Sequence, residues 1–169
     1  WISMLEASFI IFLLQPHFKN FNKRITKTPK LYFFDTGLAC SLLRINSSKD
    51  VALSPFKGAL FENLIIADFY KQYCNKGSRP PLYFWRDKGG AFEVDCIIDE
   101  GNQLYSVEIK SSYTFSNDFF RGINHWNDLA SNPTSNSFII YGGTENQLRT
   151  NGTVLGWQSG ATLVEKIKS

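Results

Sequence analysis

Three short runs of apolar and β-branched residues, each ended by a turn signal, form the clearest pattern in the chain. They span Leu82–Arg86, Phe92–Asp99 and Leu104–Lys110. The segments Asp87-Lys88-Gly89-Gly90 and Glu100-Gly101-Asn102, which separate them, contain the residues that favour tight turns. The pattern therefore predicts three consecutive antiparallel strands.

The alternation of side chains within these strands brings charged residues together. Successive residues of a strand point to opposite faces of the sheet. Glu108 and Lys110 should therefore share one face of the third strand, and on the second strand Asp95 should lie on the face opposite to Val94 and Cys96. Antiparallel pairing of the two strands predicts that Asp95, Glu108 and Lys110 meet.

The first 45 residues have a different pattern. Apolar positions in Trp1–Leu14 fall close to helical spacing and predict a helix. His17–Lys23 and Leu31–Phe34 can form a hairpin, and Leu38–Leu43 reads as a short helix. This order of elements resembles part of a winged-helix module, so residues 1–45 are expected to form an N-terminal winged-helix-like appendage.

The rest of the chain, residues 52–169, is expected to form one α/β domain with a mixed sheet flanked by helices. A polar linker over Asn46–Pro55 should precede it. Ser137–Tyr141 should be a buried strand parallel to the third strand. Helices are expected at Phe56–Tyr73 and Phe119–Leu129, a loop at Gly142–Gly152, a strand at Thr153–Trp157 and a terminal helix at Thr162–Ile167.

Composition excludes several classes of chemistry. The 169 residues carry a net charge of +3, with two histidines and three cysteines that lack metal-site spacing. Neither a zinc site nor a hydrolase triad has support, and no phosphate-binding loop of the G-x-x-x-x-G-K-[ST] type is present. An odd cysteine count suggests reduced thiols, and no apolar run reaches 18 residues. We therefore expect a cytoplasmic protein without a membrane span.

The predicted cluster of Asp95, Glu108 and Lys110 has a chemical use. Neighbouring carboxylates repel, so one holds a proton or both hold a cation. Oxygen donors suit Mg²⁺ or Mn²⁺, which retain several waters, and a nearby lysine can orient one of those waters or accept a proton from it. The alternative is that Glu108 and Lys110 are solvated residues on the open face of a sheet.

Several strings together resemble a known family. The strings KTPKLYFFDTGLACSLL, FKGALFENLIIADFYKQY, LYFWRDKGGAFEVDCIID and LYSVEIKSS are similar to the C-terminal domain of unknown function (DUF4143 type) of bacterial and archaeal AAA-type ATPases. The resemblance extends to the PD-(D/E)xK nuclease superfamily and implies its restriction-endonuclease-like fold. It also implies a partner, the ATPase module of the parent chain.

The resemblance assigns roles to individual residues. Asp95 and Glu108 would hold Mg²⁺ or Mn²⁺ with the Ile109 carbonyl, and Lys110 would position the attacking water. Glu62 stands where the superfamily often carries a glutamate that reaches the metal directly or through water, although a place near a helix N-terminus also explains it. Arg121 and His125 are candidate accessory residues, although a pair on a helix surface explains both equally well.

A basic segment gives the second candidate site. Lys19, Lys23, Arg24, Lys27 and Lys30 carry five positive charges without an acid among them. They could contact the phosphates of nucleic acid, form a solvated loop or dock on the ATPase. The leading hypothesis is a Mg²⁺-dependent, nuclease-like domain that hydrolyses DNA. The alternative is a non-catalytic regulatory domain that binds nucleic acid or a partner protein.

Overall fold

A computed structural model describes residues 1–17 and 28–167. Its centre is an eight-stranded sheet with the strand order β2-β1-β3-β4-β5-β6-β8-β7. The strands are β1 (Ile11–Pro16), β2 (Lys30–Phe33), β3 (Leu82–Arg86), β4 (Glu93–Asp99), β5 (Leu104–Lys110), β6 (Ser137–Tyr141), β7 (Gln147–Arg149) and β8 (Gly152–Gly156).

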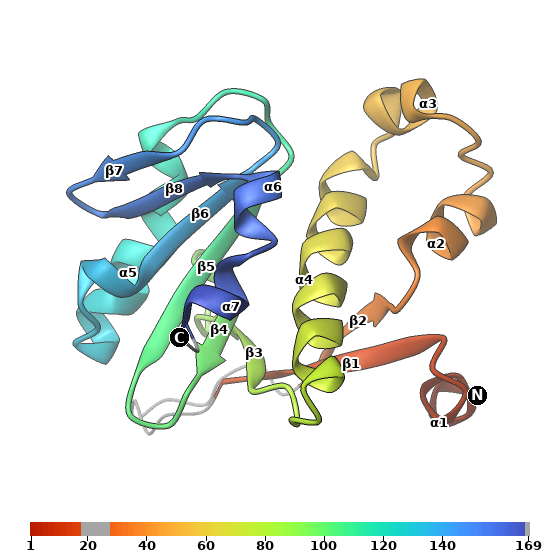
Figure 1. The fold of residues 1–169 in the computed structure, drawn as a ribbon, viewed down its shortest axis with the longest axis horizontal. Coiled ribbons are helices and arrows are strands. Elements are labelled where there is room, and N and C mark those ends of the chain that lie inside the picture. The colour runs from red at the N-terminus through yellow and green to blue at the C-terminus, as the bar shows by residue number, and fades with distance from the viewer. Residues whose placement is uncertain (18–27, 168–169) are drawn as a thin grey trace.

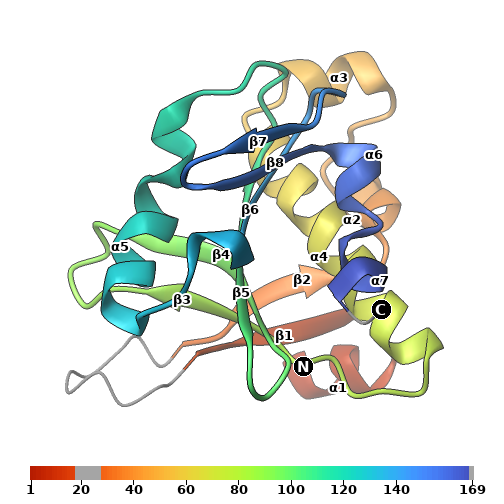
Figure 2. The same ribbon diagram turned by 60° about the vertical axis from the view of Figure 1, so that its left-hand side comes forward.

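Helices cover both faces of this sheet, as Figure 2 shows with α5 on one side and α4, α6 and α7 on the other. Within the described residues, none of them has the length and apolar character needed to cross a membrane. The helices are α1 (Ile2–Ala7), α2 (Thr36–Leu42), α3 (Ser48–Leu53), α4 (Lys57–Asn75), α5 (Arg121–Ala130), α6 (Trp157–Gly160) and α7 (Leu163–Ile167), with 3-10 turns η1 (Asn117–Phe120) and η2 (Thr134–Asn136).

The central strands pair as the sequence predicts. Strands β3, β4 and β5 form an antiparallel meander, and β6 lies parallel to β5. The expected long helix, the helix before β6, the strand near residue 153 and the terminal helix correspond to α4, α5, β8 and α7. The mixed α/β architecture is confirmed.

Each face of the sheet has its own core. Ile66, Phe69 and Tyr73 of the long helix α4 are fully buried on one face. On the other face Ile123 and Trp126 of α5 are equally buried. Burying a large apolar side chain contributes about 1.5–3 kcal/mol, so these two helices fix the position of the strands between them.

The predicted helix over Trp1–Leu14 is confirmed for its first part, Ile2–Ala7, and is wrong for the rest. Helix α1 ends at Ala7, Phe9 takes a left-handed conformation with φ 54°, and β1 begins at Ile11. The apolar positions fit either periodicity over so short a run. Burial against the sheet, which leaves Ile11 only 1% exposed, decides in favour of the strand.

The expected hairpin forms with a different first strand. Strand β2 pairs antiparallel with β1, with Ile11 opposite Phe33 and Leu14 opposite Lys30. The predicted strand His17–Lys23 lies almost wholly outside the described residues. Strand β1 also pairs parallel with β3, so the first 45 residues add two strands to the common sheet instead of standing beside it (Figure 1).

Two segments expected to be irregular contain short elements. The linker includes α3, where Ser47 and Asp50 cap each other: the Asp50 amide donates to Ser47 Oγ, and Ser47 Oγ donates to the Asp50 carboxylate. The loop 142–152 contains β7, which pairs antiparallel with β8. Both elements are too short for their periodicity to stand out in the sequence.

One side chain fastens β2 to the long helix. Asn63 of α4 donates to the Phe33 carbonyl at 3.0 Å and to Thr36 Oγ1 at 2.9 Å, and it accepts from the Phe33 amide at 2.8 Å. It is 6% exposed. Because β2 is an edge strand held on its other side only by β1, these bonds locate it against α4.

We therefore expect Asn63→Ala to lower the free energy of unfolding by about 2–4 kcal/mol, since it leaves buried polar groups without partners. Urea denaturation measures this. Asn75→Ala, an exposed change at the end of the same helix, should shift the value by less than about 0.5 kcal/mol. Equal effects of the two substitutions would contradict the role given to Asn63.

Candidate active site

An extra residue in β4 determines the position of Asp95. Between the pairs Tyr83–Ile97 and Trp85–Val94 the register shifts, so two residues of β4 face one of β3. Val94 consequently packs with the α5 core and Cys96 with the α4 core. The expectation that these two side chains share a face is wrong, because a β-bulge interrupts the alternation.

The Asp95 side chain links β4 to β5. The paired register of the two strands runs from Asp99–Leu104 to Cys96–Val107. Just beyond it, Asp95 Oδ2 accepts a hydrogen bond from the Ile109 amide at 2.9 Å. The carboxylate thus replaces a main-chain acceptor at the end of the ladder and lies beside the Glu108–Lys110 segment.

Glu108 and Lys110 lie on one face of β5, as predicted. Lys110 Nζ donates to Glu108 Oε1. The second oxygen of that carboxylate, Oε2, is buried and has no hydrogen-bond partner among the described residues. A buried carboxylate oxygen without a partner is costly, so it marks a position where a cation or a water could bind.

Helix α5 closes over this face of the sheet. A hollow of about 210 Å³ is lined by Glu93, Glu108, Lys110, Arg121 and Gly122, among others. A Cβ atom at Gly122 would lie 2.1 Å from the Glu93 carbonyl oxygen. Only glycine allows the first turn of α5 to approach β4 so closely, and this approach leaves a small, polar hollow at the carboxylates.

Burial and the charge of a neighbouring acid raise the pKa values of both Glu108 and Asp95. Burial raises the pKa of Glu108 to about 8, and the charge of Asp95 adds to this effect. Burial also raises the pKa of Asp95, to about 6, with the charge of Glu62 as the next cause. The pair therefore favours a shared proton or a cation near neutral pH, as the sequence suggests.

Lys30 of β2 also enters the cluster. Its Nζ lies 2.9 Å from Glu62 Oε1 and 3.7 Å from Asp95 Oδ1, and it forms an ion pair with Glu93. Burial by itself would lower the pKa of Lys30, but the charges of these three acids raise it above its ordinary value. Lys30 therefore remains protonated.

Glu62 occupies the outer side of the cluster. It accepts from Tyr32 Oη at 2.5 Å in addition to Lys30, so its link to Asp95 passes through the lysine. Glu93 is bound in turn by Arg86 Nε at 2.6 Å. The cluster thus sets four carboxylates against three cationic side chains.

The accessory residues occupy two different environments. The Arg121 guanidinium lies 5.1 Å from the Phe92 ring and lines the hollow beside Lys110. The His125 ring stacks on Phe92 with centroids 4.1 Å apart. Arg121 is therefore placed to meet an anion in the hollow, whereas His125 packs against an aromatic ring.

The predicted set of site residues did not include Glu93, Arg86 or Tyr32. Glu93 and Tyr32 each lie two positions from a predicted site residue on the same strand, Asp95 and Lys30 respectively. That spacing was the available signal. Of the predicted nucleic-acid residues, Lys19, Lys23, Arg24 and Lys27 lie outside the described residues.

The structure offers few alternatives for a metal. Within residues 1–17 and 28–167 no three His, Cys, Asp or Glu side chains form a group that could hold an ion. The candidate donors are Asp95, Glu108 and the Ile109 carbonyl, a set that suits Mg²⁺ because this ion retains waters. The unpartnered Oε2 of Glu108 fits such an ion.

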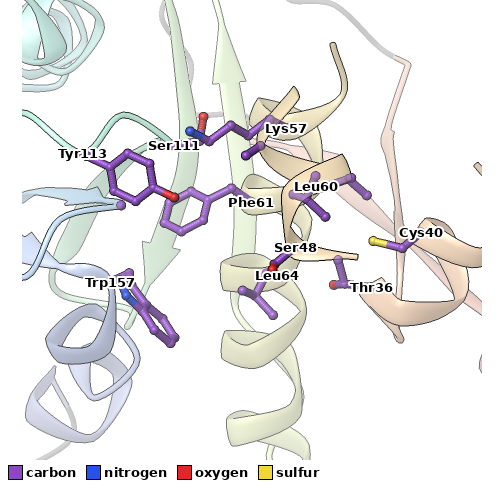
Figure 3. A pocket seen from close by; sticks show the side chains of 13 residues that line it. Thr36, Cys40, Ser48, Lys57, Leu60, Phe61, Leu64, Ser111, Tyr113 and Trp157 are labelled. Carbon is purple, nitrogen blue, oxygen red and sulfur yellow. The ribbon is translucent and has the colours of Figure 1, made fainter. Parts of the chain in front are cut away.

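A larger pocket lies apart from the carboxylates. It encloses about 470 Å³, and Figure 3 shows Phe61, Tyr113 and Trp157 around it. Lys57 Nζ lies 4.4 Å from the centroid of the Tyr113 ring. No carboxylate lines this pocket among the residues that the structure describes, so the cluster at β4 and β5 is the better candidate for chemistry.

We expect the stability of the metal-free protein to fall as the pH rises from about 5 to about 8. The raised pKa values mean that the folded state binds more protons than the unfolded state in this range, which favours the fold at lower pH. Glu93, which also faces Glu108, has a lowered pKa and titrates below the range, and Lys110 titrates above it. Urea titrations with a chelator measure the slope.

Glu108→Gln should flatten this pH dependence, because it removes the group with the larger shift. Glu145→Gln, at an exposed carboxyl, serves as the control and should keep the wild-type slope. A slope of the same size in the Glu108→Gln protein would remove Glu108 as its source.

Comparison with known proteins identifies the family of the chain, but the matching domains and relatives have no assigned activity. A domain of unknown function, DUF8612, matches residues 1–49. The chain is 31% identical over 114 residues to the uncharacterized proteins Mb2031c of Mycobacterium bovis and Rv2008c of Mycobacterium tuberculosis; the match covers 68% of this chain and 25% of each relative. The model of another domain of unknown function, DUF4143, matches residues 57–159, which is more than half of the chain, and the protein therefore belongs to the DUF4143 family.

Proposed function

We propose that the protein is a Mg²⁺-dependent, nuclease-like domain of the PD-(D/E)xK superfamily that hydrolyses phosphodiester bonds of DNA. One observation carries the proposal. Asp95 on β4 and the Glu108-Ile109-Lys110 segment of β5 are joined by the Asp95–Ile109 hydrogen bond, beside a buried carboxylate oxygen without a described partner. An aspartate, a second acid and a lysine are the parts that such hydrolysis requires.

Some of these groups would bind the metal ion, and Lys110 would orient the attacking water. Asp95, Glu108 and the Ile109 carbonyl would hold the ion. The pKa values of the two acids are raised first by burial and then by the charge of a neighbouring acid, and a bound cation would offset both. When bound, Mg²⁺ lowers the pKa of a coordinated water and offsets the charge that develops on the phosphate.

Lys110 would act as a charged, orienting group. Burial lowers its pKa, but the nearby charges of Glu108 and Asp95 raise it above its ordinary value. A lysine that remains protonated cannot accept a proton from water. It would hold the attacking water and stabilise the phosphate, and this favours the first of the two roles considered for it.

Positive side chains near the hollow support an anionic substrate. Arg121 lines the hollow together with Lys110, so a phosphate could meet both. Glu62 would assist from farther out, since it holds Lys30 beside Asp95. The basic residues Lys19, Lys23, Arg24 and Lys27 remain candidates for contacts with the DNA backbone.

The place of the domain in a longer protein forms part of the proposal. The aligned segment covers only 25% of each mycobacterial relative, which supports a domain carried by a larger chain. We propose that this chain is a cytoplasmic AAA-type ATPase with the DUF4143 domain at its C-terminal end.

A second function is favoured by the ion pairs of the cluster. Lys30 and Lys110 already neutralise part of the acidic charge without any metal. A domain with this arrangement could keep the fold but lack cleavage, and serve as a regulatory module that binds nucleic acid or a partner protein.

Cleavage assays on supercoiled and single-stranded DNA with Mg²⁺ test the leading proposal. Lys110→Ala and Asp95→Ala should each lower the rate by roughly 10²-fold or more, because each removes a group used in the transition state. Lys71→Ala, at an exposed lysine of α4, should leave the rate unchanged. Cleavage at the wild-type rate by the Lys110 or Asp95 variant would remove the assignment.

Calorimetry with Mn²⁺ separates the two functions. The nuclease proposal expects one bound ion and cleavage, with both lost in Asp95→Ala. Binding of the ion without cleavage of either DNA form would favour the regulatory module. Absence of binding would exclude the metal site.

A further inference from the structure

The pocket of about 470 Å³ lies at the carboxyl ends of three parallel strands. Strands β5, β6 and β8 run parallel, and their last residues are paired with one another, so the strands end at the same level. The residue directly after each strand, Ser111, Gly142 and Trp157, lines the pocket. In open α/β sheets this end of the strands is where ligands bind.

The size and the rings of the pocket suit a small molecule. Its volume falls within the range of about 300–1,000 Å³ that is typical of small-molecule sites. Figure 3 shows the rings of Phe61, Tyr113 and Trp157 grouped at one end of the pocket and Cys40 at the other. Tyr113 is 69% exposed and Trp157 is 38% exposed. These two rings are therefore accessible to a flat, apolar ligand.

Lys57 gives the pocket a positive charge. Its ammonium Nζ lies 4.4 Å from the centroid of the Tyr113 ring, and the residue is half-buried. Within residues 1–17 and 28–167, no acid forms an ion pair with Lys57 and no carboxylate lines the pocket. The charge of Lys57 is thus available to an anion.

The first turn of α4 adds to this charge. The helix begins at Lys57, and its N-cap residue Phe56 supplies no side-chain hydrogen bond to the first turn. A Cβ atom at Gly58 would lie 4.0 Å from Ser111 Oγ, so the start of the helix lies beside the end of β5. The positive end of the helix dipole and the Lys57 ammonium therefore meet at the same wall of the pocket.

We propose that this pocket binds a small organic anion that consists of a flat, apolar ring system with one carboxylate. The ring system would lie against Phe61, Tyr113 and Trp157, where aromatic contacts favour it. The carboxylate would accept a hydrogen bond from the Lys57 ammonium, beside the Ser111 hydroxyl. Because the lining carries positive charge and no described acid, an anion is favoured over a neutral or cationic ligand.

The pocket and the candidate active site lie on opposite faces of β5. Ile109 packs in the core beneath α4, whereas Lys110 lines the hollow beneath α5. Ser111, the next residue, lines the pocket on the α4 side. Binding of the organic anion requires no metal, so the inference goes beyond the proposed nuclease and does not depend on it.

The test is a titration of the full chain with 2-naphthoate, followed by NMR chemical shifts, with a chelator present so that no metal contributes. Two matched compounds separate ring from charge: 2-naphthalenemethanol has the ring without the charge, and acetate has the charge without the ring. We expect a dissociation constant of roughly 1 mM or lower for 2-naphthoate. The neutral compound should bind roughly 10-fold more weakly, and acetate should not saturate.

Two substitutions assign the contacts. Lys57→Gln should weaken 2-naphthoate roughly 10-fold and leave the neutral compound unchanged, because it removes only the charge. Tyr113→Ala should weaken both compounds, and the exposure of this ring means that the fold does not depend on it. Lys71→Gln, at an exposed lysine of the same helix, controls for the change in net charge and should match the wild type.

Two cysteines locate the ligand. Cys40 lines the pocket, whereas Cys74 is exposed near the opposite end of α4 and does not line it. Saturating 2-naphthoate should slow the alkylation of Cys40 by iodoacetamide and leave the rate at Cys74 unchanged, as mass spectrometry measures. An unchanged ratio of the two rates would place the ligand elsewhere and overturn the inference.

The titrations decide the remaining points. Absence of saturable 2-naphthoate binding removes the pocket as a ligand site. Equal affinities of the wild type and Lys57→Gln for 2-naphthoate, or of the wild type for the charged and neutral compounds, remove the preference for an anion. Cleavage assays with Mg²⁺ address the proposed nuclease separately, so either proposal can fail while the other stands.

Discussion

Repulsion between closely placed carboxylates, two of them buried and two half-buried, is the constraint on which the centre of this molecule depends. Glu62, Glu93 and Asp95 lie around a single ammonium group, and Glu108 pairs with Lys110. Without the positive charges of Lys30 and Lys110 beside them, these acids would have to take up protons. The elements that carry the cations, β2 and β5, are therefore as important to the site as the elements that carry the acids.

A β-bulge makes this arrangement possible. The extra residue in β4 turns Asp95 toward the Ile109 amide instead of into either core, while Val94 and Cys96 pack on opposite faces. Bulges are enriched next to active sites because they redirect one side chain without disturbing the rest of a strand. Here the bulge allows a carboxylate to sit at the end of the β4–β5 ladder and to face both Lys30 and the Glu108–Lys110 segment.

The site combines two segments that sequence families treat as separate. Lys30 belongs to the segment that matches DUF8612, whereas the four acids belong to the DUF4143 segment. The sheet crosses this boundary through the pairing of β1 with β3, and Asn63 fastens β2 to α4. The first 45 residues thus complete the acidic cluster of the following domain, and a DUF4143 domain cut at residue 57 would leave Glu62, Glu93 and Asp95 without Lys30.

The sequence by itself determined the meander, the long helix, the parallel strand β6 and the meeting of Asp95 with the Glu108–Lys110 segment. Turn residues, two-residue alternation and helical spacing depend only on residues close together in the chain, so these elements can be predicted from the sequence. It could not determine that Ile11–Pro16 is a strand, because a short apolar run fits both periods until the sheet buries it. Nor could it place Lys30 in the cluster: the lysine is 32 residues from Glu62 along the chain, and only the docking of β2 against α4 brings their side chains together. Local patterns fixed the strands that carry the acids, while long-range packing decided which cation neutralises them.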